Sequence, residues 1–490
     1  MPDNMLLNNE QRAFFELVNE AAFANPFSDD RQSVNRRIAG ISDNQTISEG
    51  ALLESAVNAV RERLQGWQSA SETSNLNRLP ENDMKLVRMA QLFLAYHEHM
   101  ESFDRLIVQQ EQSSDSTPVK FARDLLSRLG ISGFTERDSV HYLALFWQLR
   151  RAYHYIGRQI VGVCPSVIRL RMHLWNAVFT CRPDWYLDYL CGRMEDFSTL
   201  LLGETGTGKT AAARAVGFAS YIPFDAERGR FLENFTHTFL AINLAQYSSG
   251  LIESELFGHR KGAFTGAVDQ HKGVFEVCGK YGTVFIDEIG DVDLPTQTKL
   301  LTVLQDRCFS PAGSHDRLRF NGRVLAATNR DLEQLRKTGH FRDDLYYRLC
   351  SDVIQIPSLR QRLAEDPKEL GLIVTALVAR IVGPAAEGFA VTIERRLPID
   401  YAWPGNVREL EQAIRRICLT GSYLPASGDL ANGNSAFLNK IRLGELEAPE
   451  LLAGYCRDLY AKHGSYQKVA QVTGLDRRTV KKYLSPDQFN

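Results

Sequence analysis

The sequence lacks the features that mark membrane-spanning, secreted and strongly basic proteins. No apolar run reaches the length of a bilayer span, and the stretch at residues 371–383 is interrupted by Arg380. The N-terminal residues have neither the basic start nor the continuous apolar core of a signal peptide. Lys and Arg number 57 against 59 Asp and Glu, so the overall charge indicates no nucleic-acid partner. Such a partner has to be sought in a local basic patch.

Paired cysteines are also missing. The eight cysteines include no Cys-x-x-Cys motif, and a chain of 490 residues needs no disulfide framework to form a core. We expect them to be buried, reduced thiols. Hydrophobic residues make up 44% and charged residues 24%, the balance of an ordinary globular protein. These absences together predict a soluble, cytoplasmic protein with no membrane partner.

The spacing of apolar residues differs between parts of the chain. The first part shows the three- and four-residue spacing of helices, whereas the second alternates short apolar runs with helical segments. That alternation predicts an α/β core, a parallel sheet with flanking helices. We expect an all-α N-terminal domain, an α/β subdomain, a helical lid, a linker and a C-terminal helix-turn-helix. Their predicted boundaries are residues 1–164, 165–357, 358–422, 423–444 and 445–490.

A glycine-rich loop follows the first predicted strand and opens an alanine-rich helix. It has the Gly-x-x-x-x-Gly-Lys-Thr pattern in the context that phosphate binding requires, and an accidental glycine turn is the alternative. Backbone N–H groups and the helix N-terminus can bind phosphate oxygens. Lys209 would pair with the β- and γ-phosphates, and Thr210 would offer its hydroxyl to Mg²⁺. The predicted nucleotide-binding residues are Gly203, Glu204, Thr205, Gly206, Thr207, Gly208, Lys209 and Thr210.

Polar residues follow two further predicted strands. Asp287 is suited to hold Mg²⁺ through water, and Glu288 is suited to polarise an attacking water. Carboxylates at this end of a strand lie where open α/β sheets place ligands, although a surface acidic turn is the alternative. Asn329, beside Thr328, could sense the γ-phosphate, but asparagine at a strand end is more often a turn residue.

Three arginines are candidates for contacts with a nucleotide. Arg342 and Arg348 lie six residues apart on a predicted helix, and Arg408 lies in the first turn of a later one. Such arginines are usually solvated or paired on the surface. In an NTPase ring, however, an arginine offered across a subunit boundary can stabilise charge on the transferred phosphoryl group.

An uncharged segment with glycine near both ends carries a single aromatic side chain. Glycine favours a bent, mobile backbone, and Phe264 stands at the centre of the segment. An exposed aromatic ring at a flexible tip suits an interface anchor, and a buried turn is the alternative. The predicted contact residues are Gly262, Ala263, Phe264, Thr265, Gly266 and Ala267.

The C-terminal end predicts two short helices around Gly474. We expect Val469, Ala470 and Val472 to form the core of the first helix, with Val480 and Leu484 in the second. Asp476 is a plausible N-cap of the second helix. From residue 451 onward the sequence contains seven basic and three acidic residues. The resulting net charge of +4 would attract phosphate. The predicted DNA-binding residues are Arg477, Arg478, Thr479, Lys481 and Lys482. A solvated basic helix that only packs is the alternative.

In their order along the chain, these motifs resemble those of bacterial sigma-54-dependent transcription activators. The motifs are the glycine loop, "ESELFGHRKGAFTGA", "FIDEIGD", "AATNRDL", "FRDDLYYRL" and "WPGNVREL". The resemblance covers about residues 166–422, and the C-terminal end resembles the Fis-type module of many members. The hexapeptide at residues 262–267 is highly specific to this family, whereas the nucleotide motifs alone indicate only AAA+ ATPases.

The resemblance implies a bacterial, cytoplasmic activator that uses ATP and Mg²⁺ as cofactors. Its partners would be sigma-54 with RNA polymerase and upstream double-stranded DNA, and its active form a homo-oligomeric ring, usually a hexamer. Phe264 and Thr265 would contact sigma-54. Asn243 would pair with the catalytic glutamate and transmit the nucleotide state to that loop.

Further roles carry over by position. Arg342 and Arg348 match the arginines that act across the subunit boundary, and Arg408 matches the nucleotide sensor of the lid. Thr210 stands where many members carry Glu. Pro367 falls where a lid helix should begin, which leaves that boundary open by several residues.

The first 164 residues would regulate the ring in response to an unknown signal. They show neither the initial strand nor the paired-acid pocket of a response-regulator receiver, and no metal-ligand cluster. The segment at residues 145–162 is rich in aromatic and arginine side chains, which could line a ligand pocket or a partner groove, or simply pack a helix bundle. Two other functions stay open: an AAA+ remodeller with a different client, and a DNA-binding regulator whose ATPase serves only assembly.

Overall fold

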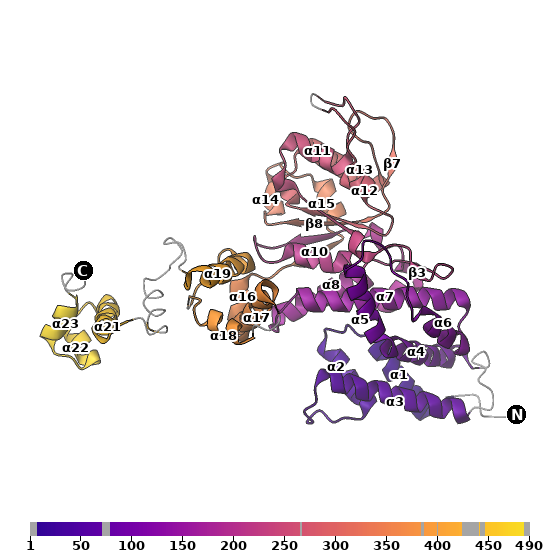
Figure 1. The fold of residues 1–490 in the computed structure, drawn as a ribbon, viewed down its shortest axis with the longest axis horizontal. Helices are drawn as coiled ribbons and strands as arrows, with labels where there is room; N and C mark the ends of the chain where they lie inside the picture. Colours follow the sequence, from indigo (N-terminus) through magenta and orange to yellow (C-terminus); the bar gives the residue numbers. More distant parts are fainter. Residues whose placement is uncertain are drawn as a thin grey trace. The chain divides into compact units, whose positions relative to one another are not determined.

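The chain forms two compact units in a computed structural model (Figure 1). The model describes residues 7–70, 79–264, 267–383, 387–398, 400–423, 441 and 446–484. The first unit contains Met1–Val161, Pro165–Glu204 and Gly208–Pro357, and the second contains Gly162–Cys164, Thr205–Thr207 and Ser358–Asn490. Most of the linker predicted at residues 423–444 lies outside the described residues.

A five-stranded parallel sheet forms the centre of the first unit. Its strands run in the order β4-β5-β8-β1-β9, and every pair is parallel. These strands are β1 (Thr199–Leu202), β4 (Phe239–Asn243), β5 (Thr283–Asp287), β8 (Arg323–Thr328) and β9 (Asp352–Gln355). The predicted parallel sheet is therefore confirmed. Two short antiparallel pairs accompany it: β2 (Phe224–Asp225) with β3 (Arg230–Phe231), and β6 (Cys308–Phe309) with β7 (Leu318–Arg319).

Helices cover both faces of this sheet, as a parallel sheet requires. In β5 the side chains of Val284 and Ile286 belong to one core, while the ring of Phe285 stacks on Phe239, at 5.8 Å between centroids. The Val284 core also takes side chains from α11 (Ser249–Phe257), α13 (Leu294–Asp306), α14 (Leu332–Lys337) and α15 (Asp343–Leu349). In Figure 1, α10 (Lys209–Gly217) and α8 (Pro165–Phe179) lie on the opposite side of the sheet.

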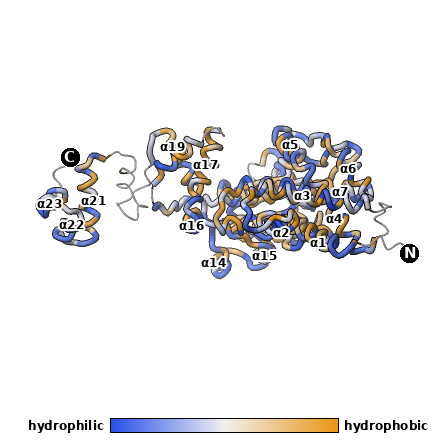
Figure 2. Tube along the Cα trace, turned by 90° about the horizontal axis from the view of Figure 1, so that it is seen from below, coloured by the Kyte–Doolittle hydropathy of each residue, from blue (hydrophilic) through white to orange (hydrophobic). Residues whose placement is uncertain are grey.

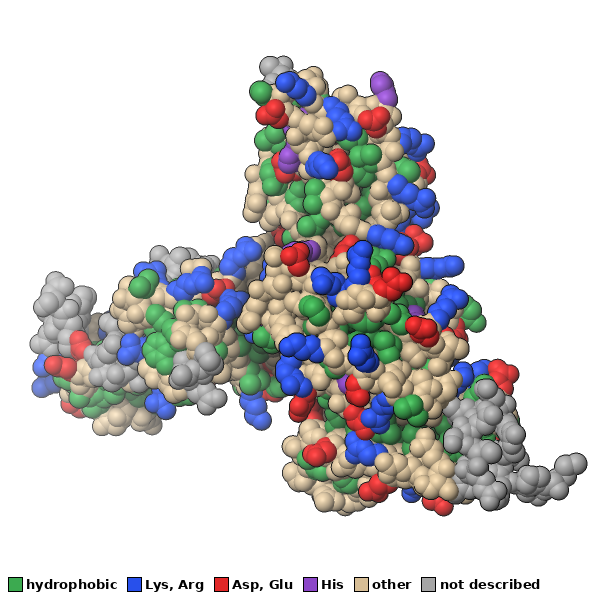
Figure 3. Space-filling model, turned by 45° about the vertical axis from the view of Figure 1, so that its right-hand side comes forward, with side chains coloured by type: hydrophobic (Ala, Val, Ile, Leu, Met, Phe, Trp, Pro, Cys, Tyr) green, Lys and Arg blue, Asp and Glu red, His purple; other side chains and the backbone are tan. Residues whose placement is uncertain are grey.

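The N-terminal part is helical, as predicted. Its helices are α1 (Asn9–Phe23), α2 (Asp29–Ala39), α3 (Glu49–Ala70), α4 (Glu81–Glu98), α5 (Met100–Glu111), α6 (Ala122–Ile131) and α7 (Glu136–Gln159). The first four share a core that includes Phe15, Val18, Val60 and Val87. Figure 3 shows acidic and basic side chains interspersed over one face of the protein, in keeping with the near-zero net charge.

Helix α7 attaches these N-terminal helices to the α/β layer. Arg151 is fully buried and donates hydrogen bonds to the carbonyls of Phe218 and Ser220, just after the C-terminus of α10. Burial lowers the pKa of Arg151 to about 9. Carbonyl groups at a helix C-terminus carry partial negative charge and favour such a cation. Trp147 stacks on Phe231 of the β2–β3 pair. The two parts consequently form one unit rather than separately packed bodies.

The second unit begins with a helical core. Its helices are α16 (Leu359–Glu365), α17 (Lys368–Val382), α18 (Glu387–Glu394) and α19 (Asn406–Thr420). Pro367 lies between α16 and α17, directly before the first residue of α17. The proline therefore separates two short helices and begins the second, instead of interrupting one long helix.

Three further helices of this unit, α21 (Ala448–His463), α22 (Tyr466–Thr473) and α23 (Arg477–Leu484), share a small core of Cys456, Val469 and Val480. Figure 2 shows hydrophilic residues along α22 and α23. One core prediction was wrong: the side chain of Val472 is 53% exposed. It lies three residues after Val469, but in so short a helix only one narrow face is covered by α21 and α23.

The cysteines depart from the prediction in part. Cys164 and Cys456 are buried, whereas Cys181 and Cys418 are exposed. Both exposed cysteines lie at or near a helix end. Their position in the fold, and not the residue type, therefore explains their exposure. Within the described residues, no helix is long and apolar enough to span a membrane.

Candidate functional site

The glycine loop joins β1 to α10, as the sequence predicts. Gly208 caps the helix with a φ of 104°, a conformation that residues with a side chain rarely adopt. Lys209 is 6% exposed, and its Nζ donates hydrogen bonds to the carbonyls of Gly203 at 2.9 Å and Glu204 at 3.2 Å. The loop backbone therefore encloses the ammonium group, which stands at the helix N-terminus where anions are favoured.

Two carboxylates and a hydroxyl meet beside this loop. Oδ2 of Asp287 lies 3.5 Å from Oγ1 of Thr210, and Oδ1 of Asp287 accepts a hydrogen bond from the N–H of Glu288. Glu288 has a φ of 57°, a strained conformation for a residue with a side chain. Its carboxylate accepts a hydrogen bond from the N–H of Asn329 at 3.3 Å. The carboxyl ends of β1, β5 and β8 thus bring together residues predicted from three separate motifs.

Asn243 reaches the same edge by strand register, since it is the Cα partner of Asp287 across β4 and β5. Its side chain accepts a hydrogen bond from the N–H of Ala245, at 3.0 Å, and so caps a short turn. Glu288 is bonded to Asn329 instead. Within the described residues the Asn243 side chain and the Glu288 carboxylate thus have separate hydrogen-bond partners, and their pairing stays a prediction.

The tip of the glycine loop belongs by its contacts to the second unit. The N–H of Arg408 lies 3.4 Å from the carbonyl of Gly206, and the Arg408 side chain is exposed. Asn406 is fully buried, donates to the carbonyl of Thr205 at 3.1 Å and accepts from the N–H of Leu359 at 2.8 Å. Sequence analysis did not single out Asn406. The Pro-Gly-Asn run before a helix was the available signal, since Asn tolerates its φ of 55°.

The two arginines of the α15 segment have different surroundings. Arg342 forms an ion pair with Asp344, at 2.7 Å between Nη2 and Oδ2, which also holds the pKa of Asp344 below its usual range. The side chain of Arg348 is exposed. The guanidinium of Arg342 is thus held by an ion pair, whereas the side chain of Arg348 lies at the protein surface.

The segment around Phe264 forms a loop on a closed stem. His259 and His271 exchange two backbone hydrogen bonds, at 2.9 and 3.0 Å. Gly258 and Gly273 stand beside this bridge in such close contact that a Cβ on Gly273 would lie 2.3 Å from the N of Gly258. Figure 1 shows this loop at the end of the α/β layer away from α1–α4. The two glycines allow the stem strands to close while the intervening residues project.

Phe264 is 41% exposed at the end of this loop. Its ring contacts the imidazole of His259 edge-on, at 4.9 Å between centroids. The N–H of Gly262 donates to the carbonyl of Ala267 at 2.8 Å, which closes the hexapeptide. Thr265 and Gly266 lie outside the described residues. The aromatic ring is therefore presented at the surface and is not part of the core.

The C-terminal helices gather basic side chains. Asp476 accepts hydrogen bonds from the N–H groups of Arg478 and Thr479 and from the Thr479 hydroxyl, and so caps α23 as predicted. These bonds, the Thr479 hydroxyl first, lower the pKa of Asp476. The exposed basic side chains of α23 are Arg477, Arg478, Lys481 and Lys482.

Comparison with known proteins identifies the central part of the chain. Residues 192–356 match the family model of the sigma-54 interaction domain. The chain is 43% identical over 220 residues to the Nif-specific regulatory protein of Azotobacter vinelandii, covering 45% of this chain and 39% of that protein. It is 42% identical over 224 residues to the sigma54-dependent transcriptional activator SfnR of Pseudomonas putida, covering 46% and 57%. The matches thus span less than two thirds of these relatives.

Among solved structures, NtrX from Brucella abortus in complex with ATP is similar to this chain, with a TM-score of 0.41 and 20% sequence identity. The similarity covers 73% of this chain and 78% of that one. The family match itself contains the glycine loop, the two carboxylates and the loop with Phe264.

Proposed function

Because the chain contains the sigma-54 interaction domain of the enhancer-binding activators, we propose that it is an ATP-dependent transcription activator. It binds upstream DNA and remodels sigma-54 RNA polymerase into the open complex, in the bacterial cytoplasm. The observation that carries this proposal is the surface position of Phe264, on a stem in the same compact unit as Lys209, Asp287 and Glu288. A nucleotide site and a projecting aromatic loop in one body suit mechanical work on a partner.

The residues of the glycine loop fit ATP with Mg²⁺. The Thr210 hydroxyl and the Asp287 carboxylate are oxygen donors that face each other, and oxygen ligands are those Mg²⁺ prefers. The metal would neutralise charge on the phosphates. Lys209 binds the β- and γ-phosphates, Glu288 orients and polarises the attacking water, and Asn329 senses the γ-phosphate. The strained backbone of Glu288 fixes its carboxylate at the strand end before the nucleotide arrives.

Gly206 provides a test of the loop tip. A Cβ at this position would lie 2.3 Å from the carbonyl oxygen of Gly405, on a backbone with a φ of 81°. We expect Gly206→Ala to displace the tip and to weaken ATP binding at least about fivefold, since such strain costs on the order of 1–3 kcal/mol. Titration with a fluorescent ATP analogue measures the affinity. Gly339→Ala is the matched control, because its φ is 74° and no atom lies within 4 Å. Equal affinity of Gly206→Ala and wild type would refute the role of the tip.

Hydrolysis requires a ring, in which Arg342 and Arg348 of one subunit serve the nucleotide of the next. The exposed position of Arg348 supports this proposal, and head-to-tail contacts of this kind close into rings. In such a ring Glu288 and Arg348 of one site come from different subunits.

Mixing two inactive variants tests this arrangement. Glu288→Gln keeps the arginine and Arg348→Ala keeps the glutamate, so a mixed boundary can hold both intact groups. We expect an equimolar mixture to recover up to about a quarter of wild-type ATPase activity, the share of such boundaries on random mixing. An equimolar mixture of Glu288→Gln with the double variant that also carries Arg348→Ala is the control and should stay inactive. If the first mixture recovers nothing although the variants co-assemble, the arginine does not act across the boundary.

Helices α22 and α23 form a helix-turn-helix that binds DNA. The short turn between α22 and α23, the Asp476 cap and the exposed basic residues of α23 support this proposal. In such a motif the second helix enters the major groove. Which side chains contact bases and which contact phosphates is left to the experiment.

Removing the positive charge of α23 should weaken DNA binding strongly. With the four basic residues Arg477, Arg478, Lys481 and Lys482 replaced by alanine, we expect affinity to fall at least about a hundredfold. The slope of log affinity against log salt should fall by about three to four, one for each lost phosphate contact. Fluorescence anisotropy with upstream DNA at several salt concentrations measures both, and unchanged ATPase activity shows that the first unit is intact. An unaltered salt slope would mean that another surface binds DNA.

A further inference from the structure

A cavity of about 400 Å³ lies inside the N-terminal part of the first unit. Its volume is within the range of small-molecule sites. Side chains from α4, α7 and α8 line it, and the apolar ones include Leu92, Phe93, Leu145, Phe146, Trp175 and Phe179. Helix packing alone would favour closing so large an apolar space, because unfilled volume in a core is destabilising.

Two arginines line this cavity, and only one of them forms an ion pair with a carboxylate of the described residues. Arg150 is paired with Asp104, at 2.6 and 2.5 Å. Arg31 has no such partner: its guanidinium donates to the carbonyl of Ala21 and lies 5.7 Å from the centre of the Phe93 ring. No carboxylate of the described residues forms an ion pair with it. Burial lowers the pKa of Arg31 to about 10, so it remains charged at neutral pH. A partly buried cation without an anion is unfavourable, and an anionic ligand would offset that cost.

A second polar group faces the cavity one helical turn along α2. Asn35 is 7% exposed, and its Oδ1 is buried without a hydrogen-bond partner. Buried acceptors of this kind are rare in native structures and ask for an explanation. Arg31 and Asn35 therefore present a positive charge and a free acceptor from the same face of α2 to the cavity, which Glu49 and Arg150 also line.

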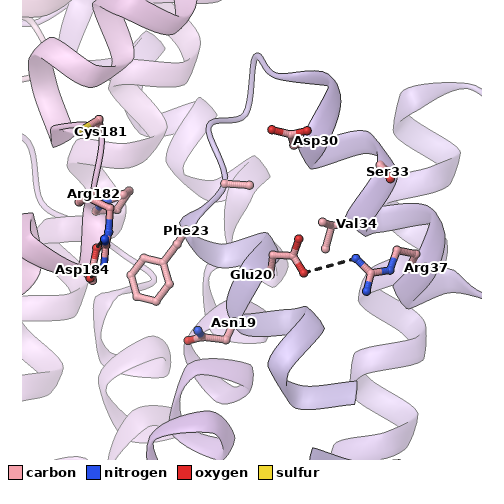
Figure 4. Close-up of a pocket in the computed structure, with 12 residues that line it drawn as sticks. Asn19, Glu20, Phe23, Asp30, Ser33, Val34, Arg37, Cys181, Arg182 and Asp184 are labelled. Carbon is pink, nitrogen blue, oxygen red and sulfur yellow. Dashed lines mark hydrogen bonds and ion pairs between the residues drawn. The ribbon is translucent and has the colours of Figure 1, made fainter. Parts of the chain in front are cut away.

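An outer groove of about 490 Å³ adjoins this cavity, and the two share Phe23, Ala24 and Pro183 in their walls. Figure 4 shows the ring of Phe23, the last residue of α1, beside the segment that carries Arg182 and Asp184. Glu20 and Arg37, which also line the groove, form an exposed ion pair at 3.5 Å. Phe23 thus belongs to the walls of both spaces.

We propose that the cavity binds a small, largely apolar molecule with one carboxylate, which pairs with Arg31 while a hydroxyl or amide N–H of the ligand donates to Asn35. The apolar body of the ligand lies against the aromatic and leucine side chains of α4, α7 and α8. A volume of about 400 Å³ holds a molecule of the size of a naphthalene carboxylate or a medium-chain fatty acid.

Hydrogen bonds connect the cavity to the C-terminal end of α10, the helix that begins at the glycine loop. Tyr186 lines the cavity and is buried, and its hydroxyl donates to Oε1 of Gln148 at 2.7 Å. Nε2 of Gln148 donates to the carbonyl of Ala219 at 2.9 Å. Ala219 lies just beyond the end of α10, the helix that begins with Lys209. Ligand binding that moves Tyr186 therefore acts on the helix of the phosphate loop; this regulatory role rests on the proposed ATPase function.

Calorimetric titration of the full-length protein tests the site. The probes are 2-naphthoate and octanoate, each compared with its methyl ester, which has neither the charge nor a hydrogen-bond donor. We expect the carboxylates to bind with one site per chain and at least tenfold more tightly than the esters. Arg31→Met should abolish this preference, and Leu149→Trp, which fills the cavity, should abolish binding. Arg37→Met on the same helix and Ile131→Trp at an exposed position are the matched controls and should bind as wild type does.

Each other outcome counts against the site. Failure of both carboxylates to bind, equal binding by carboxylate and methyl ester, or unchanged binding by Leu149→Trp would overturn it. If Leu149→Trp does not fold, Leu53→Trp fills the same cavity from α3. ATPase rates with and without 2-naphthoate then test the connection. Binding with no change in rate would keep the site and overturn its regulatory role, whereas absent ATPase activity with intact binding would count against the proposed function alone.

Discussion

Glu288→Gln is expected to reduce ATP turnover by a factor of at least about 100, since a positioned general base contributes roughly 10²–10⁴ to the rate. Affinity for ATP should stay within about threefold of wild type, because the binding groups, Lys209 and the glycine loop, are unchanged. The amide keeps the size of the side chain and can still accept from Asn329, so the left-handed backbone at this position is preserved. Phosphate release and equilibrium binding of a fluorescent ATP analogue measure the two quantities.

Glu227→Gln is the matched control for this variant. It removes a carboxylate from an exposed position of the same unit, away from the strand ends. We expect both turnover and affinity to equal those of wild type. If Glu288→Gln hydrolyses ATP at the wild-type rate, Glu288 does not activate the attacking water and the assignment of the catalytic base is wrong.

Phe264→Ala is expected to abolish promoter opening while ATP turnover stays within about twofold of wild type. Buried aromatic anchors in interfaces commonly contribute 2 kcal/mol or more, which corresponds to a loss of roughly thirtyfold or greater. The Phe264 ring contacts His259 on the loop's own stem, so we expect its removal to leave the nucleotide site intact. Single-round transcription from a sigma-54 promoter, with phosphate release followed in parallel, separates the two activities.

Val277→Ala is the control for this second variant, because it shortens another exposed apolar side chain of the same unit outside the loop. It should open the promoter as wild type does. If Phe264→Ala still opens the promoter at the wild-type rate, the loop is not the contact with sigma-54. A parallel loss of ATPase activity would instead indicate a structural role for the ring.

Those parts of the site that lie in contiguous sequence motifs could be predicted from the sequence. The glycine loop and the acidic pair follow strands with short apolar runs, and strand ends in a parallel sheet meet at one edge. Strand β9 gives little sequence signal, because its four residues include Asp352 and Gln355. The prediction for Val472 is wrong because apolar spacing cannot tell which face of a short helix its neighbours cover.

Contacts between residues far apart in the sequence were not predictable in this way. The hydrogen bonds from Arg151 to the carbonyls of Phe218 and Ser220 join residues that are 67 and 69 positions apart in the sequence. The cavity beside Arg31 depends on how helices α1 to α5, α7 and α8 pack. This packing also affects any experiment that removes the N-terminal part. Deleting residues 1–164 would uncover α10 and the β2–β3 pair, so loss of activity in such a deletion would not reveal the sign of regulation. Substitutions inside the cavity leave that interface in place.

The measurement that tests the central claim most directly is open-complex formation on a sigma-54 promoter with purified polymerase, ATP and the full-length protein. Permanganate footprinting detects the melted strands. The account predicts melting that requires hydrolysable ATP and is absent with either Glu288→Gln or Phe264→Ala. Full ATPase activity of the wild-type protein with no melting, both with and without 2-naphthoate, would contradict it and assign the ATPase to a different client.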